Sequence, residues 1–116
     1  MRLAIVGSRT FNDYGRLAVT IHNHFYLVQI TEIISGGAKG ADSLAKKYTR
    51  QFLNIKYKEF PAEWNIYGKS AGFLRNQTIV DNCDMVLAFW DGQSRGTADT
   101  IAKAKKAKKP TFIVYI

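Results

Sequence analysis

The stretch Ile34–Tyr48, with the sequence ISGGAKGADSLAKKY, joins a short apolar run to a segment of helical periodicity. Three of the five residues from Gly36 to Gly40 are glycines. Glycine loses more backbone freedom on folding than any other residue, so such a junction costs free energy. We therefore expect that another group comes close to this backbone.

The same alternation of apolar runs and helical segments extends over the whole chain. Apolar runs predict strands at 2–6, 31–35, 54–60, 84–90 and 111–116, and the alternating pattern of 54–60 favours a place near an edge. Apolar spacing predicts helices at 14–28, 41–52, 70–82 and 97–106, with Asp13 and Ser70 as N-caps. The order indicates an α/β fold, in which helices cover both faces of a five-stranded parallel sheet.

Length and composition favour one globular domain that spans residues 1–116. Hydrophobic residues make up 47% of the chain and charged residues 22%, and no stretch approaches the ~18 apolar residues of a membrane span. The apolar run before Gly7 is too short for a signal peptide, so we expect a cytoplasmic protein. Cys83 is the single cysteine and is expected to be a small buried side chain in a reducing compartment.

The formal net charge of +8 suggests an anionic partner, but it is unevenly distributed. The segment Lys103–Lys109 (KAKKAKK) holds five of the lysines. It is either a solvated helix face or a nucleic-acid patch. His22 and His24 lie two residues apart on a predicted helix, so they cannot act as an i, i+4 metal pair. We expect neither a metal nor a cofactor.

Three loops follow predicted strands and share glycine, hydroxyl and basic residues. In an open α/β sheet, ligands bind at the carboxyl ends of the strands, and these loops meet there. Glycine lets backbone N–H groups approach an anion, and a helix N-terminus adds favourable dipole charge. The predicted ligand contacts from these loops are Gly7, Ser8, Arg9, Gly36, Gly37, Lys39, Gly40, Asp42, Asp91, Ser94, Gly96 and Thr97. Neither GxGxxG nor the P-loop pattern is present.

The forked donors of Arg9 suit a phosphate. Gly36 and Gly37 either approach an anion or simply form a tight turn between strand and helix. Asp42 either contacts the ligand or is a favourable charge at a helix N-terminus. The third crossover adds Trp64, Lys69, Arg75 and Asn76 as further predicted contacts, and Trp64 either stacks on a base or packs into the core.

The stretches IVGSRTFNDY, IISGGAKGADSLAKKYT and EWNIYGKSAGFLRNQTIVDNCDMVLAFWDGQSRGT together resemble the YspA-like branch of the SLOG superfamily. The resemblance covers nearly the whole chain. It implies a compact Rossmann-like three-layer sandwich and a nucleotide or nucleotide-derived ligand such as an ADP-ribose-like molecule. Proteins of this family occur in bacteria and phages.

Two related families sharpen these expectations. The LOG phosphoribohydrolases release bases from nucleotides, and Arg75 and the Gly96-Thr97 pair match their motifs. Thr100 stands where their catalytic glutamate belongs, and Asp99 lies one position early, about 100° around a helix. The GGARGID-like motif of the DNA-processing protein DprA resembles Gly36–Asp42.

The resemblances therefore leave three hypotheses. The first is a protein that binds or senses a nucleotide-derived ligand. The second is a LOG-like N-glycosidic hydrolase with Arg75 and either Asp42 or Asp99 in catalytic roles. The third is a DprA-like binder of single-stranded nucleic acid. Each of the three hypotheses is compatible with a homo-oligomer.

Overall fold

The fold is the predicted α/β sandwich, as seen in a computed structural model that describes residues 1–27, 29–52 and 54–116. Five parallel strands form one sheet in the order β3-β2-β1-β4-β5. The strands are β1 (Arg2–Gly7), β2 (Glu32–Ser35), β3 (Lys56–Glu59), β4 (Met85–Trp90) and β5 (Thr111–Tyr115). The predicted edge position of the third strand is confirmed, because β3 pairs with β2 alone.

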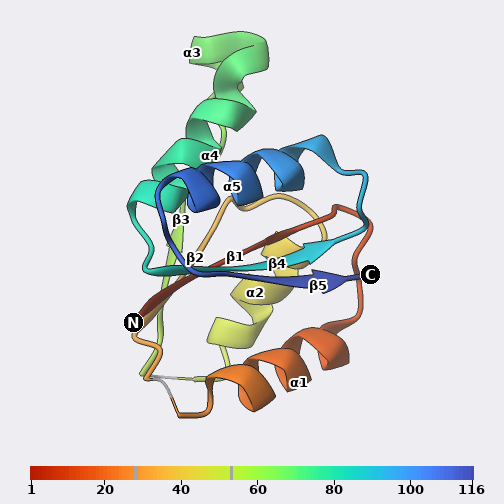
Figure 1. The fold of residues 1–116 in the computed structure, drawn as a ribbon, viewed down its shortest axis with the longest axis vertical. Coiled ribbons are helices and arrows are strands. Elements are labelled where there is room, and N and C mark those ends of the chain that lie inside the picture. Colours follow the sequence, from red (N-terminus) through yellow and green to blue (C-terminus); the bar gives the residue numbers. More distant parts are fainter. Residues whose placement is uncertain (28, 53) are drawn as a thin grey trace.

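Helices cover both faces of the sheet (Figure 1). They are α1 (Tyr14–Phe25), α2 (Ala41–Thr49), α3 (Trp64–Tyr67), α4 (Ala71–Asp81) and α5 (Arg95–Lys106), with a 3₁₀ turn η1 (Gly68–Ser70) before α4. In Figure 1, α4 and α5 lie above the sheet, whereas α1 and α2 lie below it.

Helix boundaries differ from the sequence predictions in a few places. The predicted cap Asp13 is confirmed, since its carboxylate accepts a hydrogen bond of 3.0 Å from the Arg16 N–H. The prediction of an N-cap at Ser70 is wrong, because Ser70 already has helical backbone angles and its side chain makes no capping hydrogen bond. α5 begins at Arg95, two residues before the predicted start. Phe52 lies beyond the end of α2, and Val28 lies outside the described residues.

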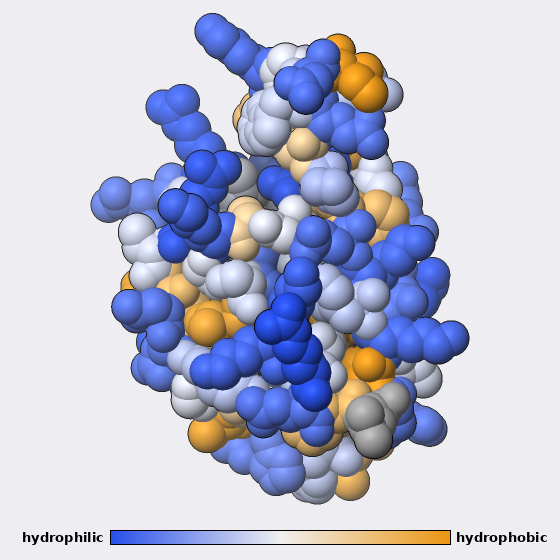
Figure 2. Space-filling view, turned by 180° about the vertical axis from the view of Figure 1, so that it is seen from behind, coloured by the Kyte–Doolittle hydropathy of each residue, from blue (hydrophilic) through white to orange (hydrophobic). Residues whose placement is uncertain are grey.

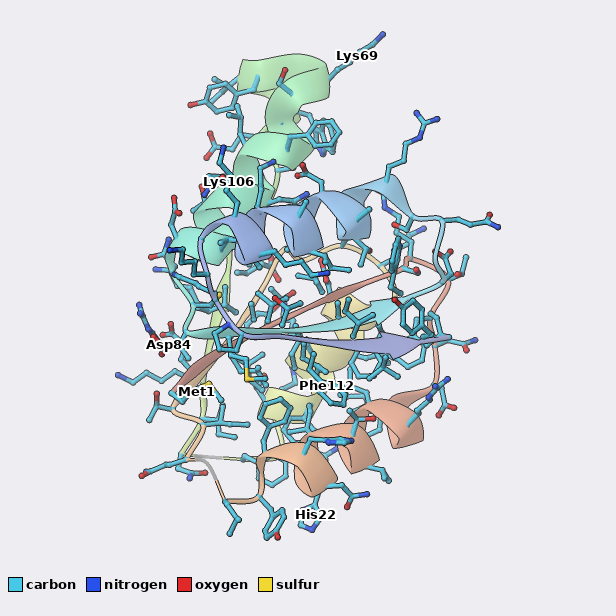
Figure 3. All side chains as sticks on the ribbon, in the orientation of Figure 1. Met1, His22, Lys69, Asp84, Lys106 and Phe112 are labelled. Carbon is cyan, nitrogen blue, oxygen red and sulfur yellow. The ribbon has the colours of Figure 1, made fainter. Side chains whose placement is uncertain are left out.

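The alternation of side chains along the two central strands builds a core on each face. Leu3 and Ile5 of β1 pack on the side of α1 and α2, where Phe112 also lies between β5 and α1 (Figure 3). Ala4 and Val6 pack on the side of α4 and α5, together with the predicted buried thiol of Cys83. Burying apolar surface on both faces is what an all-parallel sheet requires.

One part of the chain extends beyond this sandwich. We call residues 63–70, which comprise α3, η1 and the preceding Glu63, the arm. Its principal contacts are with the start of α4, and it rises past the end of the helical layer (Figure 1). Seen from behind, the molecule is mostly hydrophilic, and a hydrophobic patch lies at the tip of the arm (Figure 2). No helix within the described part of the chain has the length and apolar character needed to cross a bilayer.

Candidate functional site

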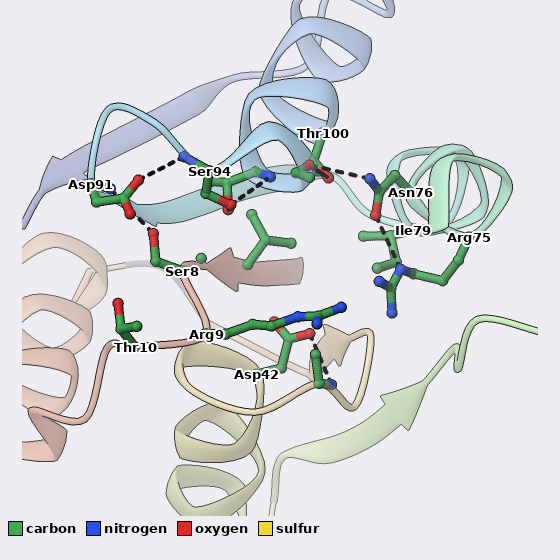
Figure 4. Close-up of a pocket in the computed structure, with 15 residues that line it drawn as sticks. Ser8, Arg9, Thr10, Asp42, Arg75, Asn76, Ile79, Asp91, Ser94 and Thr100 are labelled. Carbon is green, nitrogen blue, oxygen red and sulfur yellow. Dashed lines mark hydrogen bonds between the residues drawn. The ribbon is translucent and has the colours of Figure 1, made fainter. Parts of the chain in front are cut away.

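A cavity of about 370 Å³ opens at the carboxyl ends of β1 and β4 (Figure 4). The strand order reverses between these two strands, and such a switch point is where open α/β sheets bind their ligands. All three predicted loops reach this cavity. It is lined by Val6, Gly7, Ser8, Arg9, Thr10, Ala38, Asp42, Arg75, Asn76, Ile79, Asp91, Ser94, Gly96, Thr97 and Thr100.

The loop after β1 is held by the end of β4. The Ser8 N–H donates to the Phe89 carbonyl oxygen at 2.9 Å, and the buried Ser8 hydroxyl accepts from the Asp91 N–H at 3.2 Å. A side chain at Gly7 would lie only 2.7 Å from the Ala41 methyl group, so this position has no room for one. The backbone that carries Arg9 is therefore held in place, and the Arg9 guanidinium extends across the cavity (Figure 4).

The loop after β2 is packed against groups of the protein itself, which answers the question raised by its glycines. A Cβ at Gly36 would meet the Arg75 guanidinium, with the Arg75 Cζ at 2.8 Å. Gly40 has φ +81°, and a Cβ there would meet the backbone of Ser8 and Arg9. The glycines of this loop thus bring α4 and the β1 loop into contact with one backbone segment.

Asp42 organises the same loop from within. It is almost fully buried, and its carboxylate accepts a hydrogen bond of 3.2 Å from the Ala38 N–H. The Gly37 N–H donates to the Ser35 hydroxyl at 3.2 Å. The N–H groups of residues 37 and 38, which we had expected to approach an anion, are therefore engaged by protein groups.

Burial also changes the acidity of Asp42. Desolvation raises the pKa of its carboxyl from 3.8 to about 6, although the Ala38 N–H and the Arg75 charge oppose the rise. A carboxyl group with a pKa near 6 can exchange a proton close to neutral pH, as acid–base catalysts do. Asp42 thus accepts a hydrogen bond that holds the loop, and it also presents a titratable carboxyl group to the cavity.

Arg75 is held in place from two sides. Its Nη1 donates to the Gly36 carbonyl oxygen at 2.9 Å, and its Nε donates to the Asn76 side-chain oxygen at 3.0 Å. The buried Asn76 in turn donates to the Gly96 carbonyl oxygen at 3.2 Å and to Asp99 at 3.1 Å. Burial lowers the pKa of Arg75, the Asp42 charge opposes this change, and the positive charge of Arg9 adds to it. The two guanidinium groups are therefore close enough to repel each other.

The loop after β4 prepares the start of α5. The Asp91 carboxylate accepts hydrogen bonds from the Gln93 and Ser94 N–H groups at 2.8 and 2.7 Å. These bonds lower the pKa of Asp91. The Ser94 hydroxyl then caps the helix by accepting from the Thr97 N–H at 3.5 Å. The first turn of α5 faces the cavity at Gly96 and Thr97.

A second cavity of about 390 Å³ adjoins the first and shares Arg9, Ala38 and Arg75 with it. Its remaining lining residues are Gly36, Gly37, Lys39, Pro61, Ala62 and Trp64. The Trp64 side chain is 52% exposed, so the alternative that it fills the core is wrong. An exposed indole next to basic side chains offers an apolar face to a planar ring.

Three predicted site residues lie outside the lining of both cavities. Gly40 acts through the backbone contact described above. Lys69 projects from the end of the arm into solvent (Figure 3). Asp99 is bound to Asn76 and to Lys103, because its position on α5 turns it away from the cavity and toward α4.

The cavity also contains residues that the sequence analysis did not select, namely Val6, Thr10, Ala38, Ile79 and Thr100. Thr100 had a recognisable signal, since it lies three positions after Thr97 and an i, i+3 spacing puts both on one helix face. Ile79 had none, because its pattern is that of a core residue. Within the described ranges, no group of three or more His, Cys, Asp or Glu side chains is arranged to hold a metal ion.

Comparison with known proteins identifies the family. The model of the YspA, cpYpsA-related SLOG family matches residues 1–67, which is more than half of the chain. The Gene 61 protein of Mycobacterium phage D29 is 34% identical over 120 residues, which cover 96% of this chain and 94% of that protein. The chain therefore belongs to the YspA, cpYpsA-related SLOG family.

Solved structures of DNA processing protein A share the fold. The protein from Helicobacter pylori, described in a single-stranded DNA binding mode, aligns with a TM-score of 0.68 and 21% identity. DprA from Streptococcus pneumoniae aligns with a TM-score of 0.64 and 18% identity. Each alignment covers 97% of this chain, but only 64% and 49% of the two larger chains. The similarity supports the Rossmann-like assignment of the sheet and its helices.

Proposed function

We propose that this protein binds a nucleotide or nucleotide-derived ligand, with its phosphate between Arg9 and Arg75. The observation that carries the proposal is that two guanidinium groups from different elements line one cavity at the sheet's switch point. Like charges at close range repel each other, and an anion between them converts repulsion into attraction. The forked donors of arginine suit phosphate oxygens in particular.

The start of α5 strengthens the site for an anion. The first N–H groups of a helix have no partner within the helix, and the helix dipole favours negative charge there. In α5, Ser94 satisfies the Thr97 N–H, and Gly96 has no heavy atom within 4 Å of the place where a Cβ would lie. A phosphate oxygen can therefore approach this turn closely.

The second cavity extends the proposal to an ADP-ribose-like ligand. Because Arg9 and Arg75 line both cavities, a phosphate or diphosphate at this shared wall would have space on each side. We place a base against the exposed face of Trp64, with Lys39 nearby, and a ribose near Asp42 in the first cavity. Volumes of about 370 and 390 Å³ fall in the range of known small-molecule sites.

The test is calorimetric titration of the protein with inorganic phosphate, AMP, ADP and ADP-ribose, supported by thermal shift. In the variant Arg9→Ala, we expect the affinity for all four to fall about tenfold or more, since a charged hydrogen bond is lost. The matched control is Arg95→Ala, an exposed arginine outside both cavities. Equal losses in the two variants, or none, would contradict the proposed phosphate position.

Trp64→Ala separates the coarse proposal from the finer one. Loss of the stacking surface should weaken AMP and ADP-ribose and leave inorganic phosphate unchanged. If all ligands bind this variant as they bind the wild type, the base does not lie on Trp64.

A LOG-like hydrolase is the second candidate, and Asp42 favours it. This carboxyl lines the same cavity as Arg75 and has a pKa raised to about 6. We no longer assign Asp99 to such a reaction, since it lies outside the cavity lining and Thr100 lines it instead. Release of a free base from AMP, followed by chromatography and abolished in Asp42→Asn, would support hydrolysis.

A binder of single-stranded DNA is the third candidate, and its support is the shared fold with DNA processing protein A together with the charge of +8. Such binding releases counterions, so the affinity for an oligonucleotide should fall steeply with salt. Oligonucleotide binding that is unaffected by Arg9→Ala would place the nucleic acid outside the proposed phosphate site.

A further inference from the structure

The arm exposes far more apolar surface than its small size explains. All eight residues from 63 to 70 are exposed, and neither α3 nor η1 contains a buried residue. Trp64, Ile66 and Tyr67 nevertheless expose 52%, 69% and 52% of their surface. Helices of four residues are not stable by themselves in water, because nucleation costs more than so few hydrogen bonds return. The exposed apolar side chains of the arm are typical of a segment that is buried against a binding partner.

The first turn of α4 extends the apolar surface of the arm. Phe73 and Leu74 are 50% and 47% exposed and lie at the start of α4, which follows directly on η1. Together with the three apolar side chains of the arm, they offer roughly 500 Å² of accessible apolar area, given typical side-chain sizes. A standard protein interface buries about 800 Å² on each partner, of which about 60% is apolar. The surface around the arm therefore suffices for one side of a stable interface.

The charges of the arm indicate which partner fits. Glu63 lies at its beginning and Lys69 near its end, and both are exposed. Among the described residues, neither takes part in an ion pair within the chain. A two-fold axis that runs along the arm would place like charges together. About a two-fold axis perpendicular to the arm, two copies run antiparallel and each end meets the opposite end. Glu63 of one copy would then lie opposite Lys69 of the second copy, twice in each pair.

We propose that two copies of this chain form a homodimer through their arms, with Trp64, Ile66, Tyr67, Phe73 and Leu74 in the contact and two Glu63–Lys69 ion pairs at its rim. The contact is isologous, so the same surface serves on both protomers. The dimer needs no ligand, but it shares Trp64 with the base position proposed above, so its tests use contact residues other than Trp64.

Charge reversal tests the pairing with the intact protein in sedimentation velocity experiments. Glu63→Lys and Lys69→Glu should each raise the dimer dissociation constant about tenfold or more, because both rim pairs become repulsive. The double variant should return to the wild-type value. An equimolar mixture of the two single variants should form heterodimers, since every rim pair is then again of opposite sign.

Ile66→Glu tests the apolar part of the contact and should raise the dissociation constant about a hundredfold, as a charge placed in a contact centre does. The control is Val19→Glu on α1, an apolar residue that is 59% exposed and lies outside the arm. A wild type that stays monomeric at millimolar concentration overturns the proposal. So does an oligonucleotide that binds the monomer and is released by Ile66→Glu, because the arm would then be a nucleic-acid surface.

Discussion

The loops after β2 and β4 both contain glycines with positive φ and are each held by an aspartate, but the two aspartates lie in opposite environments. Each contains an aspartate whose carboxylate accepts backbone N–H groups: Ala38 in the first loop, Gln93 and Ser94 in the second. Asp42 is buried and its pKa is raised to about 6, whereas Asp91 is exposed and its pKa is lowered. Burial therefore destabilises the charged carboxylate in the first loop, whereas hydrogen bonds from backbone N–H groups stabilise it in the second.

The glycines follow the same division. Gly40 and Gly92 have nearly equal positive φ values, +81° and +82°. A Cβ at Gly40 would meet the backbone of the β1 loop, whereas Gly92 has nothing within 4 Å of that position. The β2 loop is thus packed against the β1 loop at Gly40, whereas the β4 loop lies open to solvent at Gly92. The contrast indicates that the first loop supports the site and the second is free to meet a ligand.

Replacing the two glycines should give the largest difference. Gly40→Ala combines an unfavourable φ with a backbone clash, and we expect it to lower the free energy of unfolding by roughly 4 kcal/mol. Gly92→Ala meets the φ penalty alone, about 1 kcal/mol. Urea unfolding of both variants measures the difference. Similar losses in the two would show that the β2 loop is no more tightly packed than the β4 loop.

The two aspartates should differ in their dependence on pH. The native state keeps the Asp42 proton up to about pH 6, while the unfolded chain releases it near pH 3.8. The free energy of unfolding therefore falls as pH rises, by about 2 kcal/mol between pH 4.5 and pH 7.5 from this group. Asp42→Asn should remove this part of the profile, as urea unfolding at the two pH values will measure.

Asp91→Asn is the matched control, because the contribution of Asp91 to the free energy of unfolding changes with pH in the opposite direction. Because the native pKa of Asp91 is lowered, its contribution is present above the unfolded pKa and is lost as the pH falls. If Asp42→Asn leaves the difference in unfolding free energy between pH 4.5 and pH 7.5 unchanged, burial does not raise the pKa of Asp42 as described.

Loss of the α5 cap should have the smallest effect. Ser94→Ala removes the acceptor of the Thr97 N–H and should cost about 1 kcal/mol. Ser43→Ala is a suitable control, since the exposed Ser43 hydroxyl donates to the Gly40 carbonyl oxygen and caps no N–H group. Thermal unfolding should show a lower midpoint for Ser94→Ala than for Ser43→Ala.

The order of the elements was predictable because it depends on local periodicity. The run that became β4 is apolar at every position, and the run that became β1 is apolar between Arg2 and Gly7, as expected for strands buried on both faces. β3 alternates as an edge strand does. The meeting of three loops at one cavity followed from the parallel topology. The direction of the Asp99 side chain, away from the cavity, also agrees with helix geometry, since a shift of one position turns a side chain by about 100°.

Other features depend on contacts between distant segments and left no local signal. The engagement of the Ala38 N–H by Asp42 arises because the loop folds back on its own helix, which the motif alone does not indicate. Trp64 and Lys69 are near in sequence, yet one borders a cavity and the other points into solvent. The helical conformation of the arm was missed because α3 is only four residues long, which is too short to show a periodic pattern.

The burial of Cys83 makes the protein convenient for spectroscopy. Its thiol is 1% exposed, and burial raises its pKa, so it should react slowly with maleimides. A cysteine introduced at an exposed position would therefore be the single fast-reacting group. One fluorophore attached there could report on the protein in solution without replacement of Cys83.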